Sequence, residues 1–312
     1  MTCTLICCSH SPLLEYMTPA GDVRAAVREA FGALGAQVRA FDPELIVVFA
    51  PDHFSGVFYD MMPAFCVGAA AESVNDYDSG AGPLAVPEPQ AVALAEALRD
   101  AELDVALSYR LRVDHGVAQP LSLLTGGLDR YPVIPVFVNC IAPPRPSCRR
   151  VRRLGQAVGA WAAGLGRRVL FIGSGGLSHD PRFPAMATAS PAARAALIAG
   201  PAPDAEAKAR REQRTREIAE EFTRGEGRSR PLNPDWDRDM LALLTGGELA
   251  RVDDFEDRWI TEQAGSGGHE LRCWIAAFAA LAAGGAYSAQ VDFYRPVPEW
   301  FVGMGIVHGA AD

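Results

Sequence analysis

Apolar residues occur along the chain in short uninterrupted runs that alternate with longer segments of helical period. The runs are rich in Val, Ile and Phe and cover residues 3–8, 44–50, 132–139 and 167–175, with a weaker one at 104–109. Uninterrupted runs are typical of strands that are covered on both faces. Their alternation with helices predicts an α/β fold with a mostly parallel central sheet flanked by helices.

Two of the intervening segments place their apolar side chains on one helical face. The first set is Val23, Val27, Phe31, Leu34, Val38 and Phe41, and the second is Val151, Leu154, Val158, Trp161 and Leu165. This spacing predicts two helices that each pack one face on the sheet.

The stretch from about residue 182 to 265 departs from this alternation. It is first rich in Pro and Ala, then forms a charged helical segment at about 204–223, and then reads PLNPDWDRDMLALLTGG, where Asn233 can cap a helix that Pro234 opens. We therefore expect a helical insertion in the C-terminal half.

A helix that starts at His269 or close to it and a strand-like segment at 287–303 complete the expected elements. No linker separates two halves, so the sequence favours one domain over residues 1–312.

Composition and charge narrow the class of protein. The chain has 312 residues, 49% hydrophobic and 21% charged, which is typical of a globular protein. Its net charge is −9 and its basic residues are scattered or lie beside Glu, so nucleic acid is excluded as the partner and a small molecule is favoured. Seven cysteines without CxxC spacing predict reduced thiols. We expect a cytoplasmic homo-oligomer without a signal peptide or membrane span.

The histidines carry the candidate chemistry. The chain has six, at positions 10, 53, 115, 179, 269 and 308. His10 and His53 follow the first two predicted strands, His179 follows a later one, and His115 precedes a predicted helix. Ligands of open α/β sheets bind beyond the carboxyl ends of the strands. We therefore expect these four side chains to meet there as metal ligands or as acid and base.

Glu270 is the carboxylate best placed to join them, since GSGGHE leads into a helix. Imidazole suits Zn, Fe, Cu and Ni, and a hard oxygen ligand beside it favours Fe(II) with open coordination positions. The alternative is that Glu270 only stabilises the helix N-terminus. His269 points elsewhere on a helix, so we expect it behind the site or on the surface.

Other motifs are weaker. Cys7 or Cys8 with His10 could begin a zinc site, but no second cysteine pair has ligand spacing. The glycine-rich IGSGGLSH lacks the GK[ST] ending of a phosphate loop, so its glycines are expected to let the backbone turn and approach a ligand. No GxSxG elbow of a serine hydrolase is present. Asp52 and Asp114 each precede a histidine and either serve a turn or cap or orient an imidazole.

The motifs SHSPL, APDHF, VDHGVAQPL, GSGGLSH and HEL occur in this order over almost the whole chain. Together they resemble the class III extradiol ring-cleavage dioxygenases of the protocatechuate 4,5-dioxygenase catalytic-subunit type. The stretches FAPDHFSGVFYDMMPAFCVG, LNPDWD and FYRPVPEW extend the resemblance to members whose catechol carries a propionate side chain.

This resemblance implies a mononuclear Fe(II) held by His10, His53 and Glu270, with a catechol and O₂ as the reactants. It also implies that His115 and His179 move protons, and we take His179 as the candidate base and His115 as the candidate acid. Candidate partners of the side-chain carboxylate are Arg112, Arg182 and Arg295. Two rival hypotheses are a zinc hydrolase that uses the same residues and a non-enzymatic binding protein on the same fold.

Overall fold

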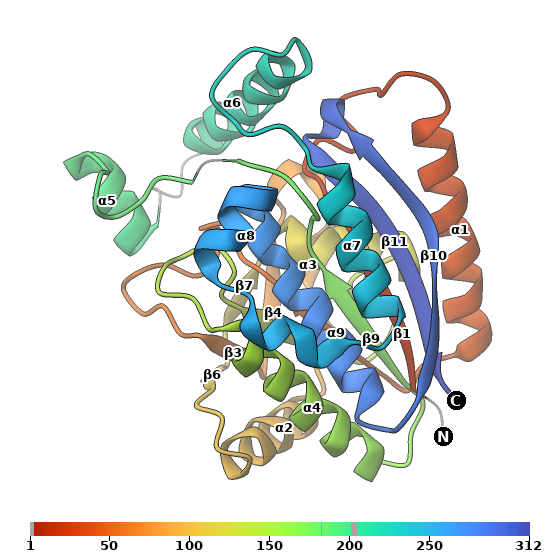
Figure 1. The fold of residues 1–312 in the computed structure, drawn as a ribbon. Helices are drawn as coiled ribbons and strands as arrows, with labels where there is room; N and C mark the ends of the chain where they lie inside the picture. The colour runs from red at the N-terminus through yellow and green to blue at the C-terminus, as the bar shows by residue number, and fades with distance from the viewer. Residues whose placement is uncertain (1–2, 182, 201–204) are drawn as a thin grey trace.

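The framework of the protein is an eight-stranded sheet between layers of helices (Figure 1). The computed structural model describes residues 3–181, 183–200 and 205–312. In spatial order the sheet contains β10 (Tyr287–Val297), β11 (Val302–Ala311), β1 (Cys3–Cys8), β9 (Val169–Ser174), β2 (Leu45–Ala50), β8 (Val133–Val138), β3 (Phe65–Gly68) and β6 (Ala106–Ser108). A second sheet has the order β5 (Ala81–Pro83), β4 (Ala71–Val74) and β7 (Leu111–Val113).

The predicted α/β fold is confirmed, but the large sheet is mixed, so the prediction of a mostly parallel sheet is only partly confirmed. Strands β1, β9, β2 and β8 are parallel to their neighbours within this group, whereas β3 is antiparallel to β8 and β11 is antiparallel to both β1 and β10. The segment expected to be strand-like at 287–303 contains β10, η4 (Pro298–Trp300) and the start of β11, and η4 reverses the chain so that β10 and β11 form a hairpin. A short turn can join only antiparallel strands.

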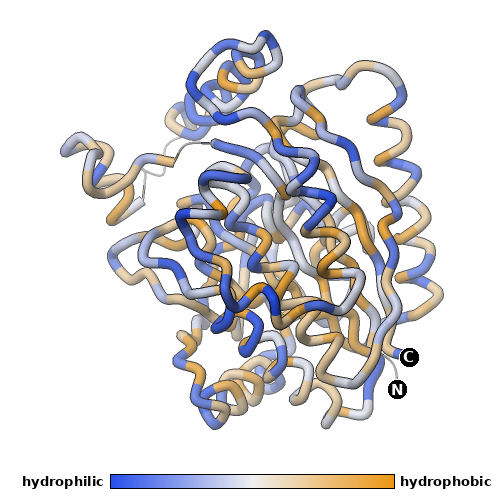
Figure 2. The backbone as a smooth tube through the Cα atoms, in the orientation of Figure 1, coloured by the Kyte–Doolittle hydropathy of each residue, from blue (hydrophilic) through white to orange (hydrophobic). Residues whose placement is uncertain are grey.

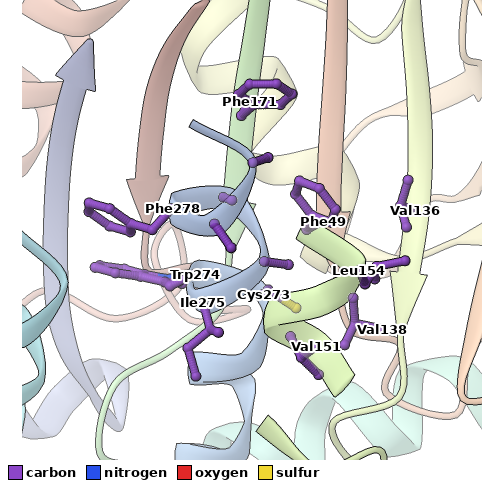
Figure 3. Packing of buried hydrophobic residues seen from close by; sticks show 14 of the residues in the cluster. Phe49, Val136, Val138, Val151, Leu154, Phe171, Cys273, Trp274, Ile275 and Phe278 are labelled. Carbon is purple, nitrogen blue, oxygen red and sulfur yellow. The ribbon is translucent and has the colours of Figure 1, made fainter. Parts of the chain in front are cut away.

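The strands supply side chains to a hydrophobic core on each face of the sheet. In β2, Leu45, Val47 and Phe49 belong to one core cluster, while Ile46, Val48 and Ala50 belong to the other. Helices α2 (Glu88–Asp100), α4 (Cys148–Gly164) and α9 (Leu271–Ala282) cover the first face, as Figure 3 shows for α4 and α9. Helices α1 (Val23–Phe41) and α3 (His115–Thr125) cover the second. This double burial explains the uninterrupted apolar runs.

Helices α4 and α9 pack closely because two glycines of α4 face α9. A Cβ atom on Gly155 would lie 2.1 Å from the carbonyl oxygen of Ala276, and one on Gly159 would lie 2.1 Å from that of Ala280. Only glycine permits such an approach. The contact holds α9 against the sheet and thereby places the residue before it, Glu270.

The predicted insertion consists of α5 (Pro191–Ala199), α6 (Ala205–Thr223), α7 (Pro234–Thr245) and α8 (Asp257–Ala264). The side chain of Asn233 accepts a hydrogen bond from the backbone N–H of Trp236 at 3.2 Å, which confirms it as the cap of α7. Helices α5 and α6 lie outside the helix layers that cover the sheet, and α6 is largely hydrophilic (Figures 1 and 2). The apolar side of α6 packs near η4, where Ala219 is buried and Phe222 contacts Phe301. The remaining turns are η1 (Asp76–Asp78), η2 (Leu249–Asp254) and η3 (Gly267–Glu270).

All seven cysteines lie within the described residues, and each thiol is free and buried. Among the helices that the structure describes, none is both long and apolar enough to cross a membrane.

Candidate active site

The four histidines that follow strands or open α3 meet at one place. His10 follows β1, His53 follows β2 and His179 follows β9, three neighbouring parallel strands whose carboxyl ends lie together. His115 is the first residue of α3. The ring of His10 lies 5.2 Å from those of His53 and His115, and the latter two rings stack at 4.5 Å. The prediction that sequence-distant histidines meet is confirmed.

Glu270 lies among these rings and is fully buried. Its Oε1 atom is 3.2 Å from Nε2 of His53 and 3.2 Å from Nε2 of His179. Its Oε2 atom is 3.5 Å from Nε2 of His10 and accepts the backbone N–H of Gly176 at 2.8 Å. Although Glu270 directly precedes α9, its side chain makes no capping hydrogen bond to that helix, and its carboxylate oxygens lie beside the histidines instead.

Hydrogen bonds assign the tautomers of His10 and His53. The Ser174 hydroxyl donates to the carbonyl oxygen of Gly116 at 2.5 Å and therefore accepts from Nδ1–H of His10 at 2.9 Å. Nδ1–H of His53 donates to the Asp114 carboxylate at 2.9 Å. In the neutral form of each ring the lone pair is therefore at Nε2, and the two Nε2 atoms lie 3.5 Å apart.

His115 and His179 are oriented in the same way. Nδ1–H of His115 donates to Asp76 at 2.6 Å, and the backbone N–H of His115 donates to the other oxygen of that carboxylate. Nδ1–H of His179 donates to the carbonyl oxygen of Leu177 at 2.9 Å. The Nε2 atom of each ring is thus the one available to accept a proton.

Burial and charge set the protonation of this cluster. Burial lowers the pKa of His10 to about 3 despite the nearby Glu270 carboxylate. Burial also opposes the charged forms of His53 and His179. The carboxylates of Asp114 and Glu270 outweigh it at His53 and raise that pKa, whereas Glu270 and the Leu177 carbonyl raise the pKa of His179. Burial raises the pKa of Glu270, but the imidazoles of His179 and His10 have the larger effect and hold that pKa well below its usual range. A buried ionised carboxylate needs a compensating cation.

The spacing of the donor atoms fits a metal ion. Metal bonds to imidazole nitrogen and carboxylate oxygen are about 2.0–2.2 Å long, so adjacent ligands at a right angle lie about 3 Å apart. Among His10, His53 and Glu270 these atoms lie 3.2 to 3.5 Å apart. Distance alone also admits His115, because donor nitrogens of His10, His53 and His115 lie within 4.8 Å of one another.

A cavity of about 450 Å³ opens over the cluster. The four histidines form part of its wall, and the remainder is mostly apolar or aromatic, with Phe54, Tyr77 and Phe183 close to the histidines. Its volume is in the range of cavities that bind small molecules. The arrangement suits a small aromatic ligand held at one end by metal and imidazoles.

The comparison with protein families identifies the chain's relatives. The model described as "Catalytic LigB subunit of aromatic ring-opening dioxygenase" matches residues 4–305. The chain belongs to the LigB family. It is therefore a member of a metal-dependent family of ring-opening dioxygenases, which confirms the predicted enzyme class. The zinc hydrolase and the non-enzymatic binding protein are disfavoured.

Individual relatives of this LigB-family chain cover nearly its whole length. A protein of Paraburkholderia xenovorans is 54% identical over 308 residues, which span 99% of this chain and 98% of the relative. One of Mycolicibacterium vanbaalenii is 51% identical over 302 residues, 97% and 96% of the two chains. Both are named 2,3-dihydroxyphenylpropionate/2,3-dihydroxicinnamic acid 1,2-dioxygenase. The crystal structure of an uncharacterized Escherichia coli K12 protein has the same fold, with a TM-score of 0.57, 14% identity and 98% coverage of each chain.

The glycine-rich turn after β9 shapes the site of this LigB-family chain. A Cβ atom on Gly175 would lie 2.7 Å from the backbone oxygen of Glu270, and one on Gly176 would lie 2.4 Å from the His179 ring. The glycines therefore allow the loop to approach Glu270 and His179 closely, and they do not form a phosphate-binding loop.

Neither group of side chains that could hold a metal in the described residues contains a cysteine, so the zinc site considered for Cys7 or Cys8 with His10 is not supported.

The two aspartates that precede histidines have different roles. Asp52 accepts three backbone N–H groups, from Ser55, Gly56 and Val57, as expected for turn chemistry. Asp114 has both of the expected roles, because one carboxylate oxygen caps α3 and the other orients the imidazole of His53.

His269 and His308 lie outside the cluster of four. His269 is buried behind the site, where its Nδ1 accepts from Arg272 and its Nε2 donates to Thr261. Burial, together with the Arg272 charge, lowers the pKa of His269 to about 2. His308 is hydrogen-bonded to Asp292 on the β10–β11 hairpin.

Two of the arginines expected at the substrate do not line the cavity. Arg112 is exposed on β7, and Arg295 is paired with the exposed Asp22. Arg182 lies outside the described residues. Sequence reasoning also missed Asp76 and Ser174, which orient His115 and His10, and Arg211, which lines the cavity. No local signal distinguishes them, because each reaches the site only through the fold.

Proposed function

We propose that this LigB-family enzyme cleaves 3-(2,3-dihydroxyphenyl)propionate, and the corresponding cinnamate, by extradiol addition of O₂. The product of the propionate is a 2-hydroxy-6-oxonona-dienedioate, in which both oxygen atoms of O₂ are retained. The observation that carries this proposal is the meeting of two imidazole nitrogens and a buried carboxylate at one end of a largely apolar cavity. The names of the full-length relatives support the choice of substrate.

His10, His53 and Glu270 would hold the metal, which we assign as Fe(II). Two neutral imidazoles and one carboxylate are the ligands that non-haem Fe(II) oxygenases use, and they leave coordination positions open. When bound, the ion would act as a Lewis acid toward the catechol oxygens and supply the redox chemistry with O₂. Ser174 and Asp114 fix the two imidazoles with Nε2 toward the site.

His179 would accept a proton from the catechol. Its Nδ1–H is held by the carbonyl of Leu177, so its lone pair is at Nε2, in the cavity wall. The protonated ring can then donate from Nε2 to Glu270, whose Oε1 atom lies 3.2 Å away. An imidazole has a pKa suited to such transfer near neutral pH.

His115 would deliver a proton to the oxygen that departs as the O–O bond breaks. The Asp76 carboxylate, 2.6 Å from Nδ1, accepts the Nδ1–H and fixes the orientation of the ring. The edge of the Tyr77 ring contacts His115, with the ring centres 5.2 Å apart. Together with Phe54 and Phe183, Tyr77 limits the water beside the reacting ring.

Anaerobic loading with Fe(II), followed by O₂ uptake over a panel of substituted catechols, tests the proposal. We expect one O₂ consumed per catechol and a ring-opened product that is strongly coloured at alkaline pH. A colourless muconate would show cleavage between the hydroxyl groups and contradict the extradiol assignment. Zinc in stoichiometric amount with hydrolytic turnover would contradict the choice of metal and reaction.

A further inference from the structure

The cavity wall contains a cation that the chemistry described above does not use. Arg211, on α6, lines the cavity together with Thr215 and Ile218 of the same helix. Among the lysines and arginines that the structure describes, it is the one in the cavity lining. Helix α6 therefore places one positive charge in a largely apolar wall.

Most N–H donors of the Arg211 guanidinium make no hydrogen bond within the described residues. Its side chain is half-buried, and within the described residues no carboxylate lies in ion-pair distance of it. Its Nη1 atom makes one long hydrogen bond of 3.4 Å, to the carbonyl oxygen of Phe54. A guanidinium has five N–H donors and matches a carboxylate in a two-pronged geometry. By contrast, Arg214 on the same helix is exposed and pairs with Glu217.

Hydrogen bonds join helix α6 to residues 75–77, the segment that also positions His115. Lys208 Nζ donates to the carbonyl of Asn75 at 2.6 Å, the backbone N–H of Tyr77 donates to Glu212 at 2.9 Å, and the Tyr77 hydroxyl lies 2.9 Å from the Thr215 hydroxyl. Asp76 lies between Asn75 and Tyr77 in the sequence, and its carboxylate accepts two hydrogen bonds from His115. Arg211 is therefore held at a defined position relative to the histidines.

The polarity of the cavity matches a ligand with two different ends. The histidines offer a place for a catechol, and Leu197, Ile218 and Phe183 supply apolar wall. Asp76 also lines the cavity, but its carboxylate accepts two hydrogen bonds from His115, so it is already engaged. The remaining strong interaction is that of Arg211 with an anion.

We infer that Arg211 binds the side-chain carboxylate of the substrate and so selects catechols with an anionic arm. The inference rests on the proposed function, since it assumes that a catechol occupies the histidine end of the cavity. The carboxylate would accept two N–H groups of the guanidinium, and burial in an apolar wall would strengthen the pair.

The test compares Arg211→Met with the native enzyme on 3-(2,3-dihydroxyphenyl)propionate and on the neutral 3-propylcatechol. We expect Arg211→Met to raise KM for the propionate roughly 10- to 100-fold, the scale of a lost charge-assisted hydrogen bond, with kcat nearly unchanged. Turnover of 3-propylcatechol should be nearly unaffected. Calorimetry with metal-free protein and the unreactive 3-(2-hydroxyphenyl)propionate should show the same loss of affinity, and Arg211→Lys should recover part of it.

Arg214→Met is the matched control, because it removes an exposed arginine of the same helix, and it should leave both substrates unchanged. If Arg211→Met weakens both substrates alike, or neither, the assignment of Arg211 is wrong while the dioxygenase proposal stands. If the native enzyme cleaves neither catechol, the proposed function fails and this inference fails with it. Melting temperatures confirm that each variant is folded, and Arg211→Gln replaces Arg211→Met if the latter is not.

Discussion

The Nδ1 atom of each imidazole in the site has a different hydrogen-bond acceptor. These acceptors are the Ser174 hydroxyl, the carboxylates of Asp114 and Asp76, and the Leu177 carbonyl. All four rings consequently present Nε2 to the cavity, so the tautomer does not separate metal ligands from proton carriers. Metal ligands and proton carriers therefore differ in the position of each ring relative to Glu270 and to the bound catechol. Single substitutions of these residues can distinguish the two roles.

Replacing His10, His53 or Glu270 by Ala should lower iron occupancy, because each change would remove one of three protein ligands. His115→Gln and His179→Gln should keep iron and catechol binding nearly intact and lower kcat by about 10² or more, the scale of lost proton transfer. Iron content and catechol affinity, measured for all five variants, check this. Loss of iron in His179→Gln, or retention of both iron and turnover in His53→Ala, would show that the assigned roles are wrong.

At the scale of elements, the contact between α4 and α9 positions the carboxylate of the site. Glu270 directly precedes α9, and α9 lies against the sheet only as closely as Gly155 and Gly159 of α4 allow. Figure 3 shows Trp274, Ile275 and Phe278 of α9 packed in the same core. A change far from the cavity can therefore displace Glu270.

Gly155→Ala should destabilise the protein by about 1–3 kcal/mol, since its Cβ atom would meet the backbone of Ala276 and force the helices apart. It should also weaken iron binding, because Glu270 moves with α9. Gly164→Ala, at the end of the same helix and with no atom near its Cβ position, is the control and should be neutral or slightly stabilising. Urea unfolding and iron titration measure both effects. Equal stability of the two variants would contradict the close packing described.

At the scale of the whole molecule, the candidate metal site joins parts of the chain that are far apart in sequence. His10 follows β1, His53 follows β2 and Glu270 precedes α9, so one ion would cross-link the ends of two strands to a helix on the sheet. An ion that binds only the folded state stabilises that state.

Removal of the metal with a chelator should therefore lower the melting temperature by several degrees, and the shift should grow with the free Fe(II) concentration used for comparison. The shift should vanish in His53→Ala and persist in His115→Gln, whose imidazole is assigned to proton transfer. Differential scanning calorimetry under anaerobic conditions gives the comparison. Identical melting of the loaded and metal-free native protein would contradict a site built from these three segments.

The sequence alone determined much of the central sheet and the place of the chemistry. The uninterrupted runs became β1, β2, β8 and β9 because strands buried on both faces require apolar side chains at every position. The histidines after these strands could be expected to meet because the carboxyl ends of parallel neighbours share one edge. These features depend on local pattern and strand order.

Tertiary structure decided what depends on the path of the chain and on long-range contacts. The directions of β3 and β11 follow from how the chain returns to the sheet, which an apolar run does not encode. Asp76 reaches His115 from 39 residues away, and its carboxylate resembles any turn aspartate in sequence. Arg211 is one of several arginines in a charged helix, and its role depends on which face of α6 docks on the Asn75–Tyr77 segment. Such docking is decided by the summed contacts of distant elements, so no local spacing could have indicated it.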